Sequence, residues 1–440
     1  MDLLCKAYSN ISDDEPESEP EPSPRPRPRP KPVNYNYLPR GPSKRRKPED
    51  PFPTVDLQKR EETPVPGRYI SKRERALSGS VPRAAEPNLS QKDPHFIPQP
   101  GLGSISDLDL PHHILLSLRH KPKAHKQLSQ IPEKLSVALC GHAKAVNAVH
   151  WSPTHAHLLA SAGMDQTICI WNVWSRDQKK AHVFSFHNAA VKDVKWSQQG
   201  LFVLSCGYDC SSRLIDVERG IETQTFKDNQ VVGVIKFHPD NSNLFLSGGS
   251  KGGLRLWDVR TGQAVHEYIR GLGQILDVEF TIDGKQFVSS SDVSGGNVSE
   301  NSIIVWDISR QVPLSNQVYA EAYTCPCVRH HPFDPYFVAQ SNGNYIAIFS
   351  SSPPFKLDKY KRYESHGVSG FPVKCNFSLD GEKLVSGSSD GSIYFYNSQS
   401  SVLVKKIKAY EQACIDVTFH PILSNVIAAC SWNGDVSVFE

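Results

Sequence analysis

The stretch 141–172 constrains the fold most, because the chain repeats its pattern. It begins at Gly141, passes through two apolar runs of alternating character and a small-residue turn at Asp165, and ends with a third run at Trp171. Runs of this length with period-two alternation, bounded by turn residues, predict β-strands. Three such strands and a following fourth make one blade of a β-propeller.

The ends of the third strands mark seven copies of this unit. They stand at Trp171-Asn172, Ile215-Asp216, Trp257-Asp258, Trp306-Asp307, Phe349-Ser350, Tyr396-Asn397 and Phe439-Glu440. Successive copies are 42 to 49 residues apart, and a four-stranded blade needs roughly 40–45 residues. An open stack of β units would need capping repeats, which we do not find in the sequence. The sequence therefore predicts an all-β fold, a seven-bladed β-propeller.

The seventh copy holds only three strands before Glu440. The segment 135–139 precedes the first copy and has the length and alternation of the missing fourth strand. We expect it to pair with the last blade, because closing the ring in this way leaves no open sheet edge at the seam.

Composition divides the chain into two parts. Residues 1–134 hold 23 of the 33 prolines and none of the seven tryptophans, and their charges lie in blocks, acidic over 13–21 and basic over 25–47. Such a segment has too little apolar surface to offset the entropy of ordering. We therefore predict a disordered, proline-rich, charge-blocked tail over 1–134 and the propeller over 135–440.

Two short segments of this tail suggest functions. The basic cluster Lys44, Arg45, Arg46 and Lys47 is typical of a nuclear import signal, with a solvated charge run as the alternative. We expect the protein in the nucleus, with the cytoplasm as the other possibility. Residues 111–118 can form a short helix with Pro111 in its first turn, which either docks on the propeller rim or binds a partner.

Several ligand classes are excluded by simple patterns. No apolar run approaches the 18 residues of a membrane-spanning helix, so we expect no membrane partner. No glycine loop of the phosphate-binding kinds is present. The cluster Cys325, Cys327, His330 and His331 lacks the spacing and strand geometry of a zinc site. We predict no cofactor, no metal and no small-molecule substrate.

Histidine, serine and aspartate recur together at one spacing. A catalytic triad is needed only once, so recurrence favours a structural hydrogen-bond chain that runs from aspartate through histidine and serine to tryptophan. We therefore predict that the protein is not an enzyme. The set comprises His142, Ser161, Asp165 and Trp171 in the first copy, His187, Ser205 and Asp209 in the second, and His366, Ser386 and Asp390 in the sixth.

These repeats resemble the WD-repeat family over residues 135–440, through Gly141-His142, Asp165, Trp171-Asn172, Trp257-Asp258 and Trp306-Asp307. The resemblance implies a non-enzymatic scaffold. The turns that end at Asp165, Asp209 and Asn433 are similar to the branch of the family with a second-step pre-mRNA splicing factor, which implies association with the spliceosome. Departures from the pattern occur at Lys251, Gly343 and Asn433 for aspartate and at Tyr410 for histidine, and we expect less firmly held loops there.

Three large side chains stand just before the aspartate position: Met164, Tyr208 and Trp432. They belong to the first, second and seventh copies, which become neighbours once the ring closes. Large apolar residues on exposed turns are typical of protein interfaces, although local packing is the alternative. We predict that these three residues form a partner-binding arc.

The leading functional hypothesis is a protein-interaction scaffold in a nuclear ribonucleoprotein or pre-mRNA splicing complex, with other proteins as partners. One alternative is a substrate adaptor for ubiquitin ligation or chromatin, which would use the same surface. Another is a weak RNA contact through the basic tail, for which affinity would fall steeply with salt.

Overall fold

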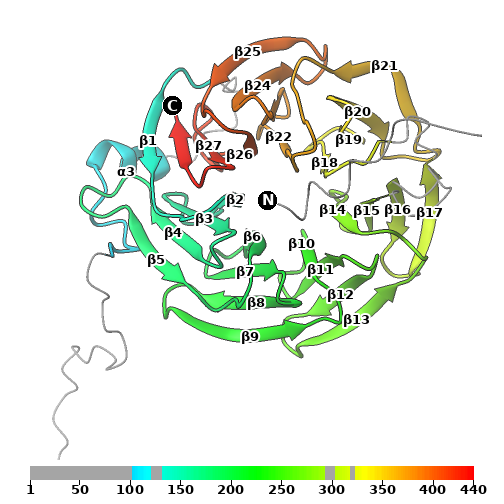
Figure 1. Ribbon diagram of the computed structural model, residues 1–440, viewed down its shortest axis with the longest axis horizontal. Coiled ribbons are helices and arrows are strands. Elements are labelled where there is room, and N and C mark those ends of the chain that lie inside the picture. The colour runs from blue at the N-terminus through cyan, green and yellow to red at the C-terminus, as the bar shows by residue number, and fades with distance from the viewer. Residues whose placement is uncertain (1–101, 120–130, 293–302, 318–322) are drawn as a thin grey trace, which may run out of the picture. The chain divides into compact units, whose positions relative to one another are not determined.

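The computed structural model describes residues 102–119, 131–292, 303–317 and 323–440. The strands in these ranges form seven four-stranded antiparallel sheets, arranged in a ring (Figure 1). The predicted seven-bladed β-propeller is thereby confirmed.

In blades one to six the four strands pair in chain order, from the inner strand to the outer strand. The strands are β2 (Val146–Trp151), β3 (Leu158–Gly163), β4 (Ile168–Asn172) and β5 (Lys180–Phe184) in blade one; β6 (Val191–Trp196), β7 (Phe202–Gly207), β8 (Ser211–Asp216) and β9 (Ile221–Lys227) in blade two; β10 (Val232–Phe237), β11 (Leu244–Gly249), β12 (Leu254–Asp258) and β13 (Gln263–Tyr268) in blade three; β14 (Ile275–Phe280), β15 (Gln286–Ser291), β16 (Ile303–Asp307) and β17 (Val312–Gln317) in blade four; β18 (Cys327–His330), β19 (Tyr336–Ser341), β20 (Tyr345–Ser350) and β21 (Leu357–Tyr363) in blade five; β22 (Cys375–Phe377), β23 (Lys383–Ser386), β24 (Ser392–Asn397) and β25 (Leu403–Lys408) in blade six.

Blade seven closes the ring with strands from both ends of the propeller. Its order is β1 (Leu135–Leu139), β28 (Val436–Phe439), β27 (Ile427–Ser431) and β26 (Cys414–Phe419). Strand β1 pairs antiparallel with β28, with Leu135 opposite Phe439, and Figure 1 shows cyan β1 beside the red strands. The predicted closing strand over 135–139 is therefore confirmed.

Second strands are more completely buried than fourth strands, because neighbouring blades cover both faces of a sheet in its middle and leave its outer edge open to solvent. Every residue of β3 is buried, whereas β25 alternates between half-buried and exposed side chains. Second and third strands are continuously apolar because both of their faces are buried. Fourth strands such as β25 alternate because one of their faces meets solvent.

Residues 102–119 correct the predicted tail boundary, because they pack on the propeller. Helix α3 (His112–Arg119) follows Pro111, as the sequence predicted. Leu110 is only 3% exposed and joins the core cluster of Trp151 and Trp174, which Ile114, Leu115 and Leu118 also contact. Apolar residues at helical spacing account for these contacts. The basic cluster at 44–47 lies outside the described residues.

Helix α3 is eight residues long. Within the described ranges, no helix is long and apolar enough to cross a membrane.

Candidate functional site

In blade one a hydrogen-bond chain joins the loops to the third strand. The Nε1–H of Trp171 donates to Ser161 Oγ at 2.8 Å, and Nε2 of His142 lies 2.7 Å from the same oxygen. Nδ1 of His142 lies 3.0 Å from Asp165 Oδ2, which also accepts from the backbone N–H of Ala143. The structure thus brings together all four residues of this polar set.

The chain in blade one carries a positive charge at its centre. Burial opposes protonation of His142, but Asp165 more than offsets this cost and raises the pKa of His142 to about 9. At neutral pH the ring is therefore an imidazolium that donates from both nitrogens. Ser161 then accepts from two donors, His142 and Trp171, which fixes the loop against the buried strand.

Blade two assembles the same contacts with a neutral histidine. Nδ1 of His187 lies 3.0 Å from Asp209 Oδ2, and Nε2 lies 2.8 Å from Ser205 Oγ. Burial lowers the pKa of His187, and the neighbouring Arg213 adds to the effect while it pairs with Asp209 at 3.3 Å. The neutral ring accepts a hydrogen bond from Ser205, whose oxygen has no indole donor because Ile215 replaces the tryptophan.

In blade six the predicted chain through His366, Ser386 and Asp390 does not form. Nδ1 of His366 lies 2.9 Å from the hydroxyl of Tyr396, and Nε2 lies 2.7 Å from Nε2 of Gln340 in blade five. The hydroxyl of Ser386 donates to Gln340 Oε1 at 3.2 Å. Histidine and serine are therefore bridged by an amide from the neighbouring blade.

Asp390 lies at the surface, apart from this network. Its side chain is 41% exposed and accepts from Lys406 at 2.8 Å and from the hydroxyl of Tyr394 at 3.0 Å. Without a carboxylate contact, burial lowers the pKa of His366 to about 4. The neutral ring thus donates to Tyr396 and accepts from Gln340.

Gln340 differs in size from the residues at the same position of the other repeats. It stands three residues after Phe337, which pairs with the aromatic end of the third strand. The corresponding positions of the other second strands hold only small residues: Ala162, Cys206, Gly248, Ser290, Gly387 and Cys430. One large amide in a row of small residues indicates a contact with a neighbouring blade.

At two of the departures from the repeat pattern, other hydrogen bonds hold the chain. In blade three, Gln230 Oε1 accepts from the backbone N–H of Lys251 at 3.0 Å, and its amide nitrogen donates to Gly253 O. In blade seven, the buried hydroxyl of Tyr410 donates to Ala429 O at 2.8 Å. That these loops are less firmly held stays a prediction.

Charged side chains in or next to the first strands form a second network, which no repeat pattern in the sequence predicts. Lys195 lies 2.6 Å from Asp193, and Lys374 lies 3.6 Å from Asp193 and 3.4 Å from Asp416. These contacts join blades two, six and seven across the ring. Burial is costly for Asp193, but the cations of Lys195 and Lys374 lower its pKa nonetheless. Similar ion pairs join Arg329 to Asp277 and Glu279, and Lys236 to Glu279.

The cysteine and histidine cluster at 325–331 has ordinary structural contacts. Cys325 and Cys327 are buried, and Cys327 Sγ lies 4.0 Å from Cys375 Sγ. Nε2 of His331 lies 2.9 Å from Gly381 O. Within the described ranges, no group of three or more His, Cys, Asp or Glu residues is placed to hold a metal ion.

The three predicted partner-binding residues occupy one turn position on three consecutive blades. The backbone N–H at this position donates to a carbonyl of the preceding loop in every blade, at 2.8–3.0 Å. The residues in this position are Met164, Tyr208, Ser250, Asp292, Asn342, Ser389 and Trp432. Large side chains therefore occur in blades seven, one and two, and small polar ones elsewhere.

The three side chains differ in exposure. Tyr208 is 48% exposed, and the ammonium of Lys192 lies 5.7 Å from the centre of its ring. Met164 and Trp432 are half-buried, and the indole of Trp432 packs edge-on against Phe371 at 5.4 Å. Local packing therefore covers part of the Trp432 side chain, whereas about half of Tyr208 is exposed to solvent.

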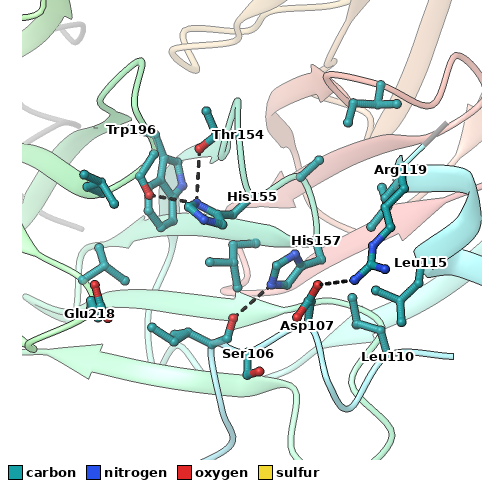
Figure 2. Close-up of a pocket in the computed structure, with 18 residues that line it drawn as sticks. Ser106, Asp107, Leu110, Leu115, Arg119, Thr154, His155, His157, Trp196 and Glu218 are labelled. Carbon is teal, nitrogen blue, oxygen red and sulfur yellow. Dashed lines mark hydrogen bonds and ion pairs between the residues drawn. The ribbon is translucent and has the colours of Figure 1, made fainter. Parts of the chain in front are cut away.

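At the other end of the strands lies a cavity of about 550 Å³. The segment 102–119 forms one wall and the loops of blades one and two form the other, with Ile422 from blade seven (Figure 2). Its lining includes Leu110, Leu115, Trp196, Leu201 and Val217, with Asp107 and Glu218 among its charged residues. No local pattern in the sequence predicts this cavity, because its walls come from distant parts of the chain.

The fold and the polar chains define a WD-repeat propeller, and comparison with known proteins agrees. The family "WD domain, G-beta repeat" matches residues 133–172, 178–216, 220–258 and 358–397. Each range holds the outer strand of one blade and the first three strands of the next, which are those of blades one, two, three and six. The chain belongs to the WD-repeat family.

Similarity to individual proteins extends over most of the propeller. The chain is 37% identical over 312 residues to WD repeat-containing protein 25 of Mus musculus, covering 70% of this chain and 58% of that protein. It is 30% identical over 337 residues to Pre-mRNA-processing factor 17 of Homo sapiens, covering 76% and 56% respectively. The chain thus spans less than two thirds of the length of either relative.

Proposed function

We propose that this protein is a non-enzymatic interaction scaffold in a nuclear ribonucleoprotein or pre-mRNA splicing complex. The observation that carries the proposal is the turn position at which blades seven, one and two alone present large side chains. Similarity to Pre-mRNA-processing factor 17 across most of the propeller supports the splicing context.

The polar residues support a binding role rather than catalysis. His142 and His187 are committed to hydrogen bonds within their blades, and His366 is committed to Tyr396 and Gln340. A general base needs an accessible nitrogen within reach of a substrate proton. These histidines instead hold loops, so the exposed turn residues are the better candidates for contacting other proteins.

The partner-binding arc is tested with the double variant Tyr208→Ala and Met164→Ala. The matched control is Ser250→Ala combined with Ser389→Ala, at the same turn position in blades three and six. Spliceosomal proteins recovered with each variant from nuclear extract would be quantified beside its melting temperature. We expect recovery to fall several-fold for the first pair only, with little loss of stability. Equal recovery for both pairs would place the binding surface elsewhere.

The identity of the recovered partners separates this proposal from an adaptor role. Recovery of ubiquitin ligase or chromatin subunits in place of splicing proteins would favour the adaptor role.

The alternative of RNA binding requires the basic tail. If the chain without residues 25–47 bound RNA as tightly as the full chain, that alternative would be contradicted. For localisation, we expect that changing Lys44, Arg45, Arg46 and Lys47 together to alanine shifts a fluorescent fusion toward the cytoplasm. An unchanged nuclear signal would leave the cluster as a solvated charge run.

A further inference from the structure

The cavity beneath the segment 102–119 lies far from the turn residues discussed above. Its walls come from the loops between first and second strands, whereas Met164 and Tyr208 follow the ends of the second strands. A six-residue strand such as β3 separates the two ends by roughly 16–20 Å. The cavity therefore offers a surface that is independent of the proposed partner-binding arc.

The segment 102–107 shows how this end of the propeller holds a polypeptide. The side-chain amide of Asn172 donates to the carbonyls of Ser104 and Ser106, both at 3.0 Å. Nε2 of His157 lies 3.0 Å from the carbonyl of Ile105. Because these hydrogen bonds are made to backbone carbonyls, they can hold an extended chain whatever its side chains.

One further donor in the cavity wall has no partner. Trp196 is 3% exposed and lines the cavity, and among the described residues its Nε1–H has no hydrogen-bond acceptor. The corresponding ends of the first strands in blades three, four, six and seven are phenylalanines: Phe237, Phe280, Phe377 and Phe419. A buried indole N–H without an acceptor is costly, and an acceptor on a bound chain would satisfy it.

The remaining walls define what such a chain must carry. Leu110, Leu115 and Val217 make an apolar lining, and Leu201 is 45% exposed beside it. The carboxylates of Asp107 and Glu218 come from the two opposite walls (Figure 2). The nearby guanidinium of Arg119 lies 3.3 Å from Asp107, so these three charges leave an excess of one negative charge.

We propose that this cavity binds a peptide segment of another protein, with one large apolar side chain inserted and an adjacent lysine or arginine. The apolar side chain lies against Leu110, Leu201 and Val217. A backbone carbonyl of the peptide accepts from the Nε1–H of Trp196, and the cation of its lysine or arginine lies between the carboxylates of Asp107 and Glu218. The volume of about 550 Å³ is within the usual range for ligand pockets, so one aromatic or long aliphatic side chain fits.

The proposal is tested by panning a phage-displayed library of random twelve-residue peptides against the full chain. We expect enrichment of sequences that share an apolar residue next to Lys or Arg. The enriched peptide, made synthetically with a fluorophore, would then be titrated against the wild type and variants by fluorescence polarisation. The variants are Leu201→Asp and Glu218→Lys on the cavity, and Trp196→Phe, which introduces the residue that blades three, four, six and seven hold at this position.

Matched controls lie away from the cavity. Leu379→Asp changes a leucine of similar exposure, 51%, in the corresponding loop of blade six, and Glu411→Lys reverses an exposed charge at the other end of the strands. Circular dichroism melts establish that each variant is folded. We expect Kd to rise about tenfold or more for Leu201→Asp and Glu218→Lys, several-fold for Trp196→Phe, and less than about twofold for the controls and for Tyr208→Ala.

Three outcomes would overturn the proposal. The first is the absence of any enriched sequence, as expected if this chain or a second copy covers the cavity. The second is an enriched motif without a basic residue. The third is an unchanged Kd for Leu201→Asp and Glu218→Lys. Because Tyr208→Ala is measured with the same peptide, failure of the cavity proposal is distinguishable from failure of the proposed partner-binding arc.

Discussion

Blades one and six carry histidine, serine and aspartate at matching positions, yet their side chains make different contacts. In blade one, His142 joins Asp165 to Ser161 within one sheet. In blade six, His366 binds a tyrosine hydroxyl and an amide from blade five, and its aspartate is left at the surface.

The difference comes from two residues outside the recurring set. Tyr396 replaces a tryptophan, and its hydroxyl reaches Nδ1 of His366, the nitrogen that contacts Asp165 in blade one. Gln340 places an amide beside Nε2, the nitrogen that contacts Ser161 in blade one. A repeated motif therefore fixes which residues are available, and the neighbouring side chains decide which hydrogen bonds form.

The comparison is tested most strongly by removing each aspartate. Asp165→Ala removes the carboxylate that accepts from the buried ring of His142 and from the backbone N–H of Ala143, so we expect a loss of about 1–3 kcal/mol in the free energy of unfolding. Asp390→Ala removes exposed contacts and should cost less than about 1 kcal/mol. Urea unfolding of both variants measures the difference, and equal losses would mean that the two aspartates have equivalent roles.

Gln340→Ala probes the contact that only blade six possesses. Gln340 is fully buried and bonds both His366 and Ser386, so its removal should lower the free energy of unfolding by about 1–2 kcal/mol. Gln340→Glu keeps the size but replaces the donor to His366 with a carboxylate. If the alanine variant unfolds like the wild type, the bridge between blades five and six contributes no stability.

The opposite pKa shifts of the two histidines predict opposite pH dependence. The pKa of His142 rises from 6.5 to about 9 on folding, so its contribution is complete below pH 6.5 and is lost as pH rises toward 9. The pKa of His366 falls from 6.5 to about 4, so its contribution is complete above pH 6.5 and is lost as pH falls toward 4.

Each histidine is compared with its glutamine variant, His142→Gln or His366→Gln. Urea midpoints between pH 4 and 9 should show wild-type advantages that shrink at opposite ends of the range, by on the order of 1 kcal/mol. Parallel curves would contradict the assigned protonation states.

The smallest effect is expected for Asn433→Ala, at the aspartate position of blade seven. Asn433 is exposed, and its amide donates to Asp435 at 3.2 Å. Because Tyr410 already replaces the histidine there, the change should cost about 0.5 kcal/mol or less. A loss as large as that for Asp165→Ala, in the same urea assay, would show that the turn contributes independently of the polar chain.

More of the fold than of the candidate sites could be predicted from the sequence. Strand ends at Trp171, Trp257 and Trp306 recur at blade spacing, and local alternation is sufficient to predict strands, blade number and the closing strand at Leu135–Leu139. The contacts of His366 were predicted wrongly because Gln340, which bridges it to Ser386, comes from the adjacent blade. The alternation within a strand does not show which blade a side chain contacts, and Gln340 differs from the other repeats only when all seven are aligned.

By itself, the sequence determined the seven sheets, their order and the positions of the large turn residues, because each depends on spacing along the chain. Tertiary structure alone decided three other features. It paired Asp193, Lys374 and Asp416 across the ring, gave His366 other partners than those predicted, and packed the segment 102–119 against blades seven, one and two. The physical reason is common to all three. Hydrogen bonds, ion pairs and cavities act over a few ångströms, and folding brings to that range residues that are up to hundreds of positions apart.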